Sequence, residues 1–158
     1  MNNLIAIKKY AINYLSKYDS SKKNLERILR NKIRKTNLPK KEKFILYNAI
    51  NSILSELEDK SILDDKKYTY IKILNYSSRG KSKNFIRNYL LQKGLSKESI
   101  DEILYNFELD NANWELESAK IFARKKNLGI IDNKEKDLAK MARAGFGYDI
   151  IKKTLGLD

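Results

Sequence analysis

Apolar residues recur every three or four positions along almost the whole chain, which is the spacing of one buried face on an α-helix. No segment shows the two-residue alternation that is typical of a half-buried β-strand. The chain also contains only one Pro and six Gly, so few positions interrupt the helical pattern. The sequence therefore predicts an all-α protein of about nine short helices.

The helical pattern is repeated. The segments FIRNYLLQKGLSKESIDEIL and LAKMARAGFGYDIIKKTL each hold an apolar helix, a glycine followed by a large apolar residue, and a second helix. A sharp reversal between helices favours a positive φ angle, so we expect Gly94 and Gly145 to adopt one. The repetition predicts three tandem, helix-turn-helix-like units of three helices, over residues 1–60, 61–109 and 110–158, which bury their faces against one another.

Several residues have the chemistry of helix starts. Ser20 and Ser21, Ser82 and Ser96 precede apolar-periodic runs and are expected to offer N-caps. Pro39 is suited to the first turn of a helix. Asp132, three residues before a glutamate, has the spacing of a capping box.

The chain carries 33 basic and 20 acidic residues, a formal net charge of +13. Residues 1–50 hold 13 basic and 3 acidic side chains, whereas residues 51–110 hold ten of each. A basic excess concentrated in one region favours an anionic partner such as nucleic acid. No apolar run is long enough to span a bilayer and no cysteine is present, so we expect a cytoplasmic protein that contacts no membrane.

The residues needed for common catalytic chemistry are missing. The chain contains neither His nor Cys, which excludes histidine acid–base catalysis, thiol nucleophiles and zinc sites of the usual type. Asp64 and Asp65 form the best carboxylate pair, but adjacent helical residues point about 100° apart, so they are expected to cap a helix. We therefore expect no enzymatic activity, no metal and no cofactor.

The clearest binding feature is a row of cations in the segment SSKKNLERILRNKIRK. Helical spacing puts Lys23, Arg27, Arg30 and Arg34 on one face, opposite the apolar residues, with the single acid, Glu26, off the row. Such a row is typical of nucleic-acid-binding surfaces. The full set of candidate residues for binding an anionic partner is Lys22, Lys23, Arg27, Arg30, Arg34, Arg79, Lys81, Lys83, Arg87, Arg124, Lys125 and Arg143.

The aromatic residues mostly lie in the apolar register, which indicates packing. Tyr70 and Tyr76 are the two tyrosines that we expect to be exposed and able to stack on bases. Trp114 is expected to be a packing anchor between three-helix units.

Four stretches, in this order, resemble the RecX family: ILDDKKYTYIKI, RGKSKNFIRNYLLQKGLS, AKIFARKK and KMARAGFGYDIIKKTL. The resemblance covers nearly the whole chain, including YAINYLSKYDSSKKNLERIL at its start. Many members have a second Gly and a Pro after the glycine that corresponds to Gly80, where this chain has Ser82 and Lys83. Many also have two arginines before the last Gly-Phe, where this chain has Arg143 and Ala144.

The resemblance implies three tandem three-helix units in an elongated, curved arrangement. It also implies that the protein binds the RecA filament on DNA and regulates the recombinase, mostly as an inhibitor, in recombination and repair. No catalysis and no cofactor are implied. We expect a monomer that binds DNA without sequence preference.

Two other functions fit the pattern. A helix, a glycine-containing turn and a second helix also occur in helix-turn-helix transcription factors. The helices after Gly94 and Gly145 begin with Ser-Lys-Glu-Ser and Gly-Tyr-Asp-Ile, which offer few side chains for reading bases. An RNA-associated basic protein is the other alternative.

Overall fold

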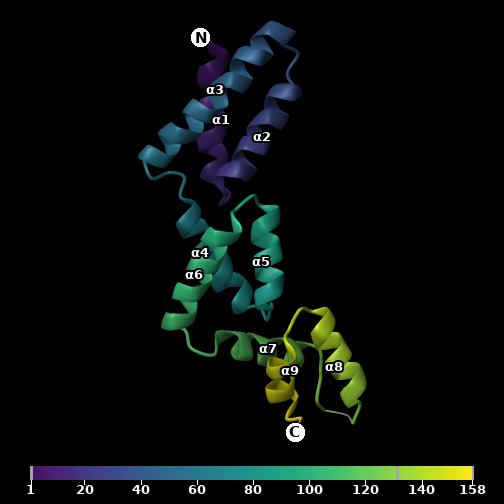
Figure 1. Ribbon diagram of the computed structural model, residues 1–158. Helices are drawn as coiled ribbons and strands as arrows, with labels where there is room; N and C mark the ends of the chain where they lie inside the picture. The colour runs from purple at the N-terminus through teal and green to yellow at the C-terminus, as the bar shows by residue number, and fades with distance from the viewer. Residues whose placement is uncertain (1, 131, 158) are drawn as a thin grey trace. The chain divides into compact units, whose positions relative to one another are not determined.

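The computed structural model describes residues 2–130 and 132–157, and within them every regular element is an α-helix. This confirms the all-α fold predicted from the hydrophobic pattern. Helices α1 to α3, in purple to blue in Figure 1, form the first group of three, and the later helices follow in chain order. The nine helices in the described ranges are α1 (Asn2–Leu15), α2 (Lys22–Arg34), α3 (Lys40–Asp59), α4 (Asp65–Ser77), α5 (Lys83–Gln92), α6 (Lys97–Asp110), α7 (Trp114–Lys125), α8 (Lys134–Arg143) and α9 (Tyr148–Leu155).

Most predicted helix starts are confirmed. The hydroxyls of Ser21 and Ser96 accept hydrogen bonds from backbone amides at the starts of α2 and α6. Pro39 is the N-cap of α3, one position before the first helical residue. The predicted capping box at Asp132 is wrong, because α8 begins after Asn133 and has no side-chain cap.

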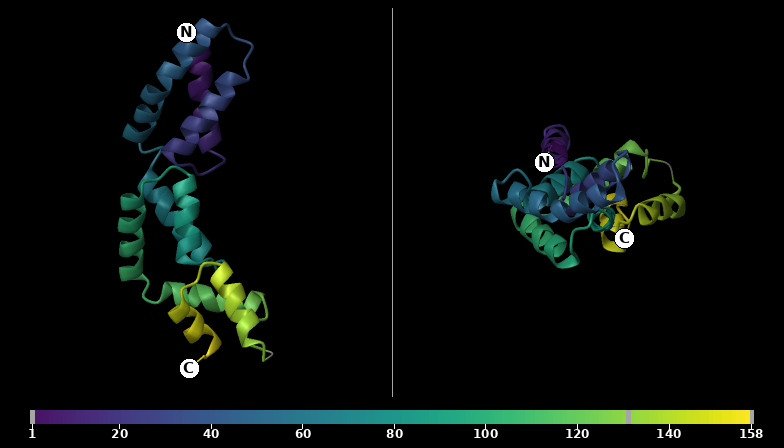
Figure 2. Two further views of the ribbon diagram at one scale, coloured as in Figure 1. Left: turned by 45° about the vertical axis from the view of Figure 1, so that its right-hand side comes forward. Right: turned by 90° about the horizontal axis from the view of Figure 1, so that it is seen from above.

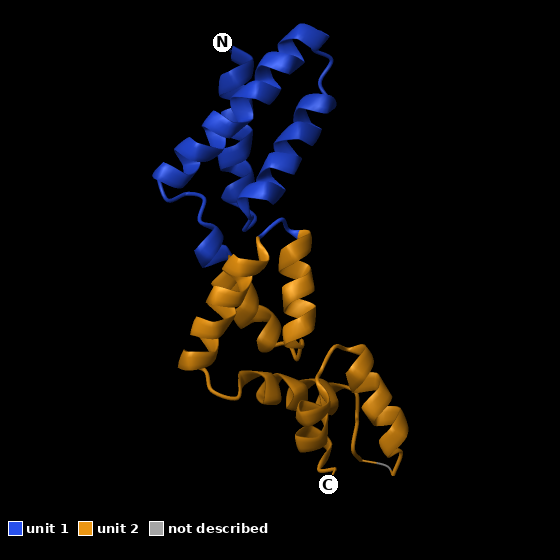
Figure 3. Cartoon of the chain, viewed as in Figure 1, with its two compact units in different colours: residues 1–68, 93–95 blue, residues 69–92, 96–158 orange. Residues whose placement is uncertain are grey.

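The chain divides into two compact units, drawn in blue and orange in Figure 3. Unit 1 comprises residues 1–68 and 93–95, and unit 2 comprises residues 69–92 and 96–158. The division into three three-helix units stays a prediction.

In unit 1, helices α1, α2 and α3 lie side by side (Figure 2) around a continuous apolar core. Leu25, Leu29 and Ile33 on α2 are fully buried in it, as are Ile50 and Leu54 on α3. Part of unit 2 packs similarly, with Ala119 on α7, Met141 on α8 and Ile151 on α9 in one buried cluster.

A polar junction joins the segments of unit 1. The Ser21 hydroxyl, which is fully buried, accepts from the amide of Asn24 at 3.2 Å and donates to the carbonyl of Lys93 at 2.6 Å. The next amide, that of Lys22, donates to Asp65 Oδ1 at 2.7 Å. The helix start of α2 therefore binds both the beginning of α4 and the turn before Gly94.

The same junction occurs a second time, within unit 2. The buried Ser82 hydroxyl accepts from the amide of Phe85 at 3.1 Å and donates to the carbonyl of Ala144 at 2.7 Å. The Lys83 amide donates to Glu115 Oε1 at 3.0 Å. The repeated sequence pattern therefore corresponds to a repeated contact, in which one serine caps its own helix and fixes the turn of a later one.

The two turns have the predicted backbone geometry, since φ is +82° at Gly94 and +93° at Gly145. Each glycine directly follows the residue whose carbonyl accepts from the junction serine: Gly94 follows Lys93, and Gly145 follows Ala144.

Candidate functional site

The predicted row of cations on α2 faces solvent. Lys23, Arg27, Arg30 and Arg34 are all exposed, whereas Leu25, Leu29 and Ile33 on the same helix are fully buried. The apolar side of α2 therefore fixes the helix against the core and leaves the cations outside.

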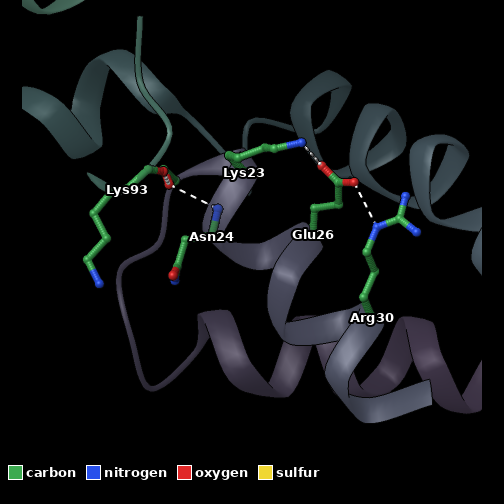
Figure 4. Close-up of polar contacts among 6 residues, drawn as sticks. Lys23, Asn24, Glu26, Arg30 and Lys93 are labelled. Carbon is green, nitrogen blue, oxygen red and sulfur yellow. Dashed lines mark hydrogen bonds and ion pairs between the residues drawn. The ribbon is translucent and has the colours of Figure 1, made fainter. Parts of the chain in front are cut away.

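The prediction that Glu26 lies apart from this row is wrong. Its carboxylate accepts from Lys23 Nζ and from Arg30 Nε, each at 2.9 Å, so it joins two members of the row (Figure 4). The hydrogen bond from Lys23, followed by that from Arg30, lowers the pKa of Glu26 below its ordinary value. The carboxylate is therefore ionised at neutral pH and offsets part of the positive charge on α2.

The other two cations of the row have no acidic partner among the described residues. The Arg27 guanidinium donates to the side-chain amide oxygen of Asn24 at 3.0 Å, and the Arg34 side chain has no hydrogen bond or ion pair there. Glu26 therefore offsets one of the four positive charges of the row, and two of its four cations have no acidic partner in the described structure.

Three further candidate cations, outside the row on α2, form ion pairs with residues of other helices or turns. Lys22 Nζ lies 2.6 Å from Glu58 and Lys83 Nζ lies 2.7 Å from Glu108, at equivalent places in the two junctions. Arg87 lies 2.9 Å from Asp101. These side chains are half-buried and contribute to packing between helices.

A second group of cations gathers in unit 2, where the turn after α4 meets the end of α7. We call Arg79, Lys81, Arg124 and Lys125 the turn cluster. Lys125 Nζ donates to the carbonyl of Arg79 at 3.2 Å. Lys81 Nζ lies 4.5 Å from the centre of the Phe85 ring, and the Lys81 carbonyl accepts from the Ser118 hydroxyl at 2.6 Å.

A close approach of backbones holds this turn against α7. Gly80 has a φ of +83°, and a Cβ atom at this position would lie 2.9 Å from the backbone nitrogen of Phe122 and 3.2 Å from the Ile121 side chain. Only glycine allows the turn to come so near.

The remaining candidate, Arg143, is exposed in the last turn of α8. Its side chain has no hydrogen bond or ion pair among the described residues.

The aromatic predictions had mixed outcomes. Tyr70 is 40% exposed, with its ring against the edge of Phe107. The prediction for Tyr76 is wrong, because it is half-buried between Phe85 and Tyr89. Trp114 is 7% exposed and packs against Phe107, as expected of a packing anchor.

Phe85 was missed in the sequence. It is 37% exposed beside Lys81, although it precedes the buried Ile86 in an apolar run. Ile86 and Leu90 are the buried residues of α5, and they are four positions apart on one face. Phe85 directly precedes Ile86 and so points away from that face, which is the only sign of its exposure in the sequence.

The acidic pair at the start of α4 has the expected capping role. Asp64 Oδ1 accepts from the amide of Lys67 at 3.0 Å, while Asp65 binds the junction amide. Burial raises the pKa of Asp65, and the hydrogen bond from the Lys22 amide opposes this change. Over residues 2–130 and 132–157, no group of three or more acidic residues could hold a metal ion, and no helix is long and apolar enough to cross a membrane.

Comparisons with known proteins identify relatives that share one name. No protein-family model matches the chain. It is 28% identical over 154 residues to the regulatory protein RecX of Myxococcus xanthus, a match that covers 92% of this chain and 81% of that protein. It is 34% identical over 116 residues to the regulatory protein RecX of Clostridium botulinum strain Eklund 17B, covering 68% of this chain but 52% of that longer protein.

Solved structures show the same fold. The crystal structure of RecX from Lactobacillus salivarius superposes with a TM-score of 0.74 at 22% identity, covering 99% of both chains. A second crystal structure of a regulatory protein RecX superposes with a TM-score of 0.66 at 20% identity, covering 98% of this chain and 72% of the other. The motifs, the helical fold and these relatives agree, and the chain belongs to the RecX family of regulatory proteins.

Proposed function

We propose that this protein regulates the RecA recombinase by binding the RecA filament on DNA, and that its main effect is to inhibit RecA's ATPase and strand-exchange activities. The observation that carries the proposal is the match to a regulatory protein RecX along 92% of the chain. The exposed cations of α2 and the turn cluster support it, because the phosphates of the DNA in the filament are anionic.

The alternative of a sequence-reading transcription factor is less well supported. In the helix–turn–helix formed by α5 and α6, the second helix would have to enter the major groove. Helix α6 carries five acidic residues and one lysine, and Glu98 stands in its first turn. Phosphates would repel such a helix, so α6 is a poor recognition helix.

The direct test is the DNA-dependent ATPase of RecA, measured with and without the protein. We expect the ATPase rate to fall as the protein is added, and strand exchange to slow in parallel. An unchanged ATPase, together with a footprint at one defined duplex sequence, would support the transcription-factor alternative. Co-purification with ribosomes and not with RecA would support the RNA-associated one.

Two variants of α2 should act in opposite directions. Changing Lys23, Arg27, Arg30 and Arg34 to Gln should weaken binding to the RecA–DNA filament, because four exposed positive charges are lost. Glu26→Gln removes the carboxylate between Lys23 and Arg30 and should strengthen binding. If both variants inhibit RecA as the parent does, the row on α2 is only a solvated face.

A further inference from the structure

The turn cluster brings together four candidate cations that have no acidic partner in the described part of the chain, whereas the other candidates without one, Arg27, Arg34 and Arg143, lie on α2 and α8. Arg79, Lys81, Arg124 and Lys125 make no ion pair with a carboxylate within the described residues, whereas Glu26 binds two members of the row on α2. Arg79, Arg124 and Lys125 are exposed and Lys81 is half-buried. Four cations of unit 2 that have no carboxylate partner in its described part are therefore gathered around one turn.

The arrangement follows from how the turn packs on α7. Gly80 lies against Ile121 and Phe122. Arg124 and Lys125 follow Ile121 by three and four residues, so they lie one helical turn beyond this contact and on the same side of α7. Lys125 Nζ reaches back to the carbonyl of Arg79, which confirms that the two segments meet there.

An ordinary role for these cations is to offset the ends of two helices. The C-terminus of a helix carries about half a negative charge, and the cluster stands where α4 and α7 both end. Two helix ends therefore offset roughly one of the four positive charges. About three remain, which is more than helix stabilisation requires.

We propose that the turn cluster binds the phosphodiester backbone of DNA. The proposal rests on the proposed function and deepens it, because it assigns DNA contact to particular residues of unit 2. Phosphates are suitable ligands for exposed Arg and Lys side chains that lack carboxylate partners, since binding releases counterions from the DNA.

Phe85 points to a preference for single strands. Its ring is 37% exposed, with Lys81 Nζ over it at 4.5 Å from the ring centre and the Tyr76 ring packed against it. Its backbone amide donates to the Ser82 hydroxyl. Aromatic rings next to cations stack on the unpaired bases of single-stranded nucleic acids. In a duplex the bases are already stacked, so the Phe85 ring would add nothing to binding.

The test is a salt series of DNA binding without RecA, followed by the fluorescence anisotropy of labelled single-stranded and duplex oligonucleotides. The turn variant has all four cluster residues changed to Gln. The control variant has Lys97, Lys136, Lys140 and Lys153 changed to Gln, so it loses the same charge as the turn variant. These four lysines are exposed, and their side chains have no hydrogen bond or ion pair in the described part of unit 2. A double variant, Arg79→Gln with Arg124→Gln, touches only exposed side chains and covers the case in which the turn variant fails to fold.

We expect the turn variant to lower the slope of log affinity against log salt by about 3 on single strands and about 3.5 on duplex DNA. The control variant should lower it by less than about one unit. Phe85→Leu should weaken single-strand binding by about tenfold or more and leave duplex binding unchanged. Equal losses in the turn and control variants, or an unchanged turn variant, would overturn the proposal.

The outcomes also separate this inference from the proposed function. A turn variant that loses DNA binding but still inhibits RecA would support the cluster as a DNA site. If the parent leaves RecA unaffected while the salt slopes change as expected, the DNA site stands and the proposed function fails. If the turn variant binds DNA normally but loses binding to RecA alone, the cluster contacts protein and the DNA proposal is wrong.

Discussion

The Ser82 hydroxyl makes two hydrogen bonds with different consequences, and replacing it should reveal both. It accepts from the amide of Phe85, which caps α5, and it donates to the carbonyl of Ala144 in the turn after α8. Ser82→Ala removes the cap, which costs about 1 kcal/mol, and leaves a part-buried carbonyl without its donor, which costs about 1–3 kcal/mol. We expect the free energy of unfolding to fall by about 2–4 kcal/mol.

Ser96→Ala is the matched control. Ser96 caps α6 with the same geometry, accepting from the amide of Ser99 at 3.2 Å, but it is exposed and donates no hydrogen bond to another helix in the described structure. Its loss should cost about 1 kcal/mol. Urea unfolding followed by far-ultraviolet circular dichroism measures both values. A Ser82→Ala variant that loses no more stability than Ser96→Ala would show that the bond to Ala144 contributes nothing.

Two further predictions concern stability. Gly80→Ala should lower the free energy of unfolding by about 1–3 kcal/mol, because φ is +83° and the new Cβ would lie 2.9 Å from the backbone nitrogen of Phe122. Gly147→Ser is the control, because φ is −71° there and no atom lies within 4 Å of a Cβ. It should cause no measurable loss of stability in the same urea unfolding experiment. Hydrogen bonds from Lys60 and then Lys8 lower the pKa of Glu56 to about 2, so its carboxylate stabilises the fold above pH 4.5 and this contribution is lost as the pH falls toward 2. Urea unfolding between these pH values should show a weaker pH dependence in Glu56→Gln, and an unchanged dependence would contradict the assignment.

The hydrophobic spacing was sufficient to predict the fold because each helix buries a regular stripe. On α2 the predicted inward residues Leu25, Leu29 and Ile33 are the ones that are fully buried. Gly94 and Gly145 were identified by their place between two helical patterns, since few other residues adopt a positive φ there. These are local properties, so one sequence contains enough information for them.

The pairing of charges was less predictable because side chains reach beyond their helical angle. Glu26 is off the row on α2 by its angle, yet its carboxylate meets both Lys23 and Arg30. The turn cluster is a tertiary feature, in which Arg79 and Lys125 meet although 46 residues separate them. No periodicity within one segment reports such a contact.

The serine junction and the turn cluster depend on the same short segment of chain. The turn that carries Arg79 and Lys81 runs directly into Ser82, and Ser82 is fixed to the carbonyl of Ala144. The Lys81 carbonyl accepts a hydrogen bond from the Ser118 hydroxyl. The backbone that carries the two cations is therefore fixed against α7 both at Gly80 and at Lys81. Cations on a fixed backbone lose less conformational entropy on binding than cations on a mobile loop. A glycine and two buried serine hydroxyls, none of them charged, therefore position the charges that we assign to DNA.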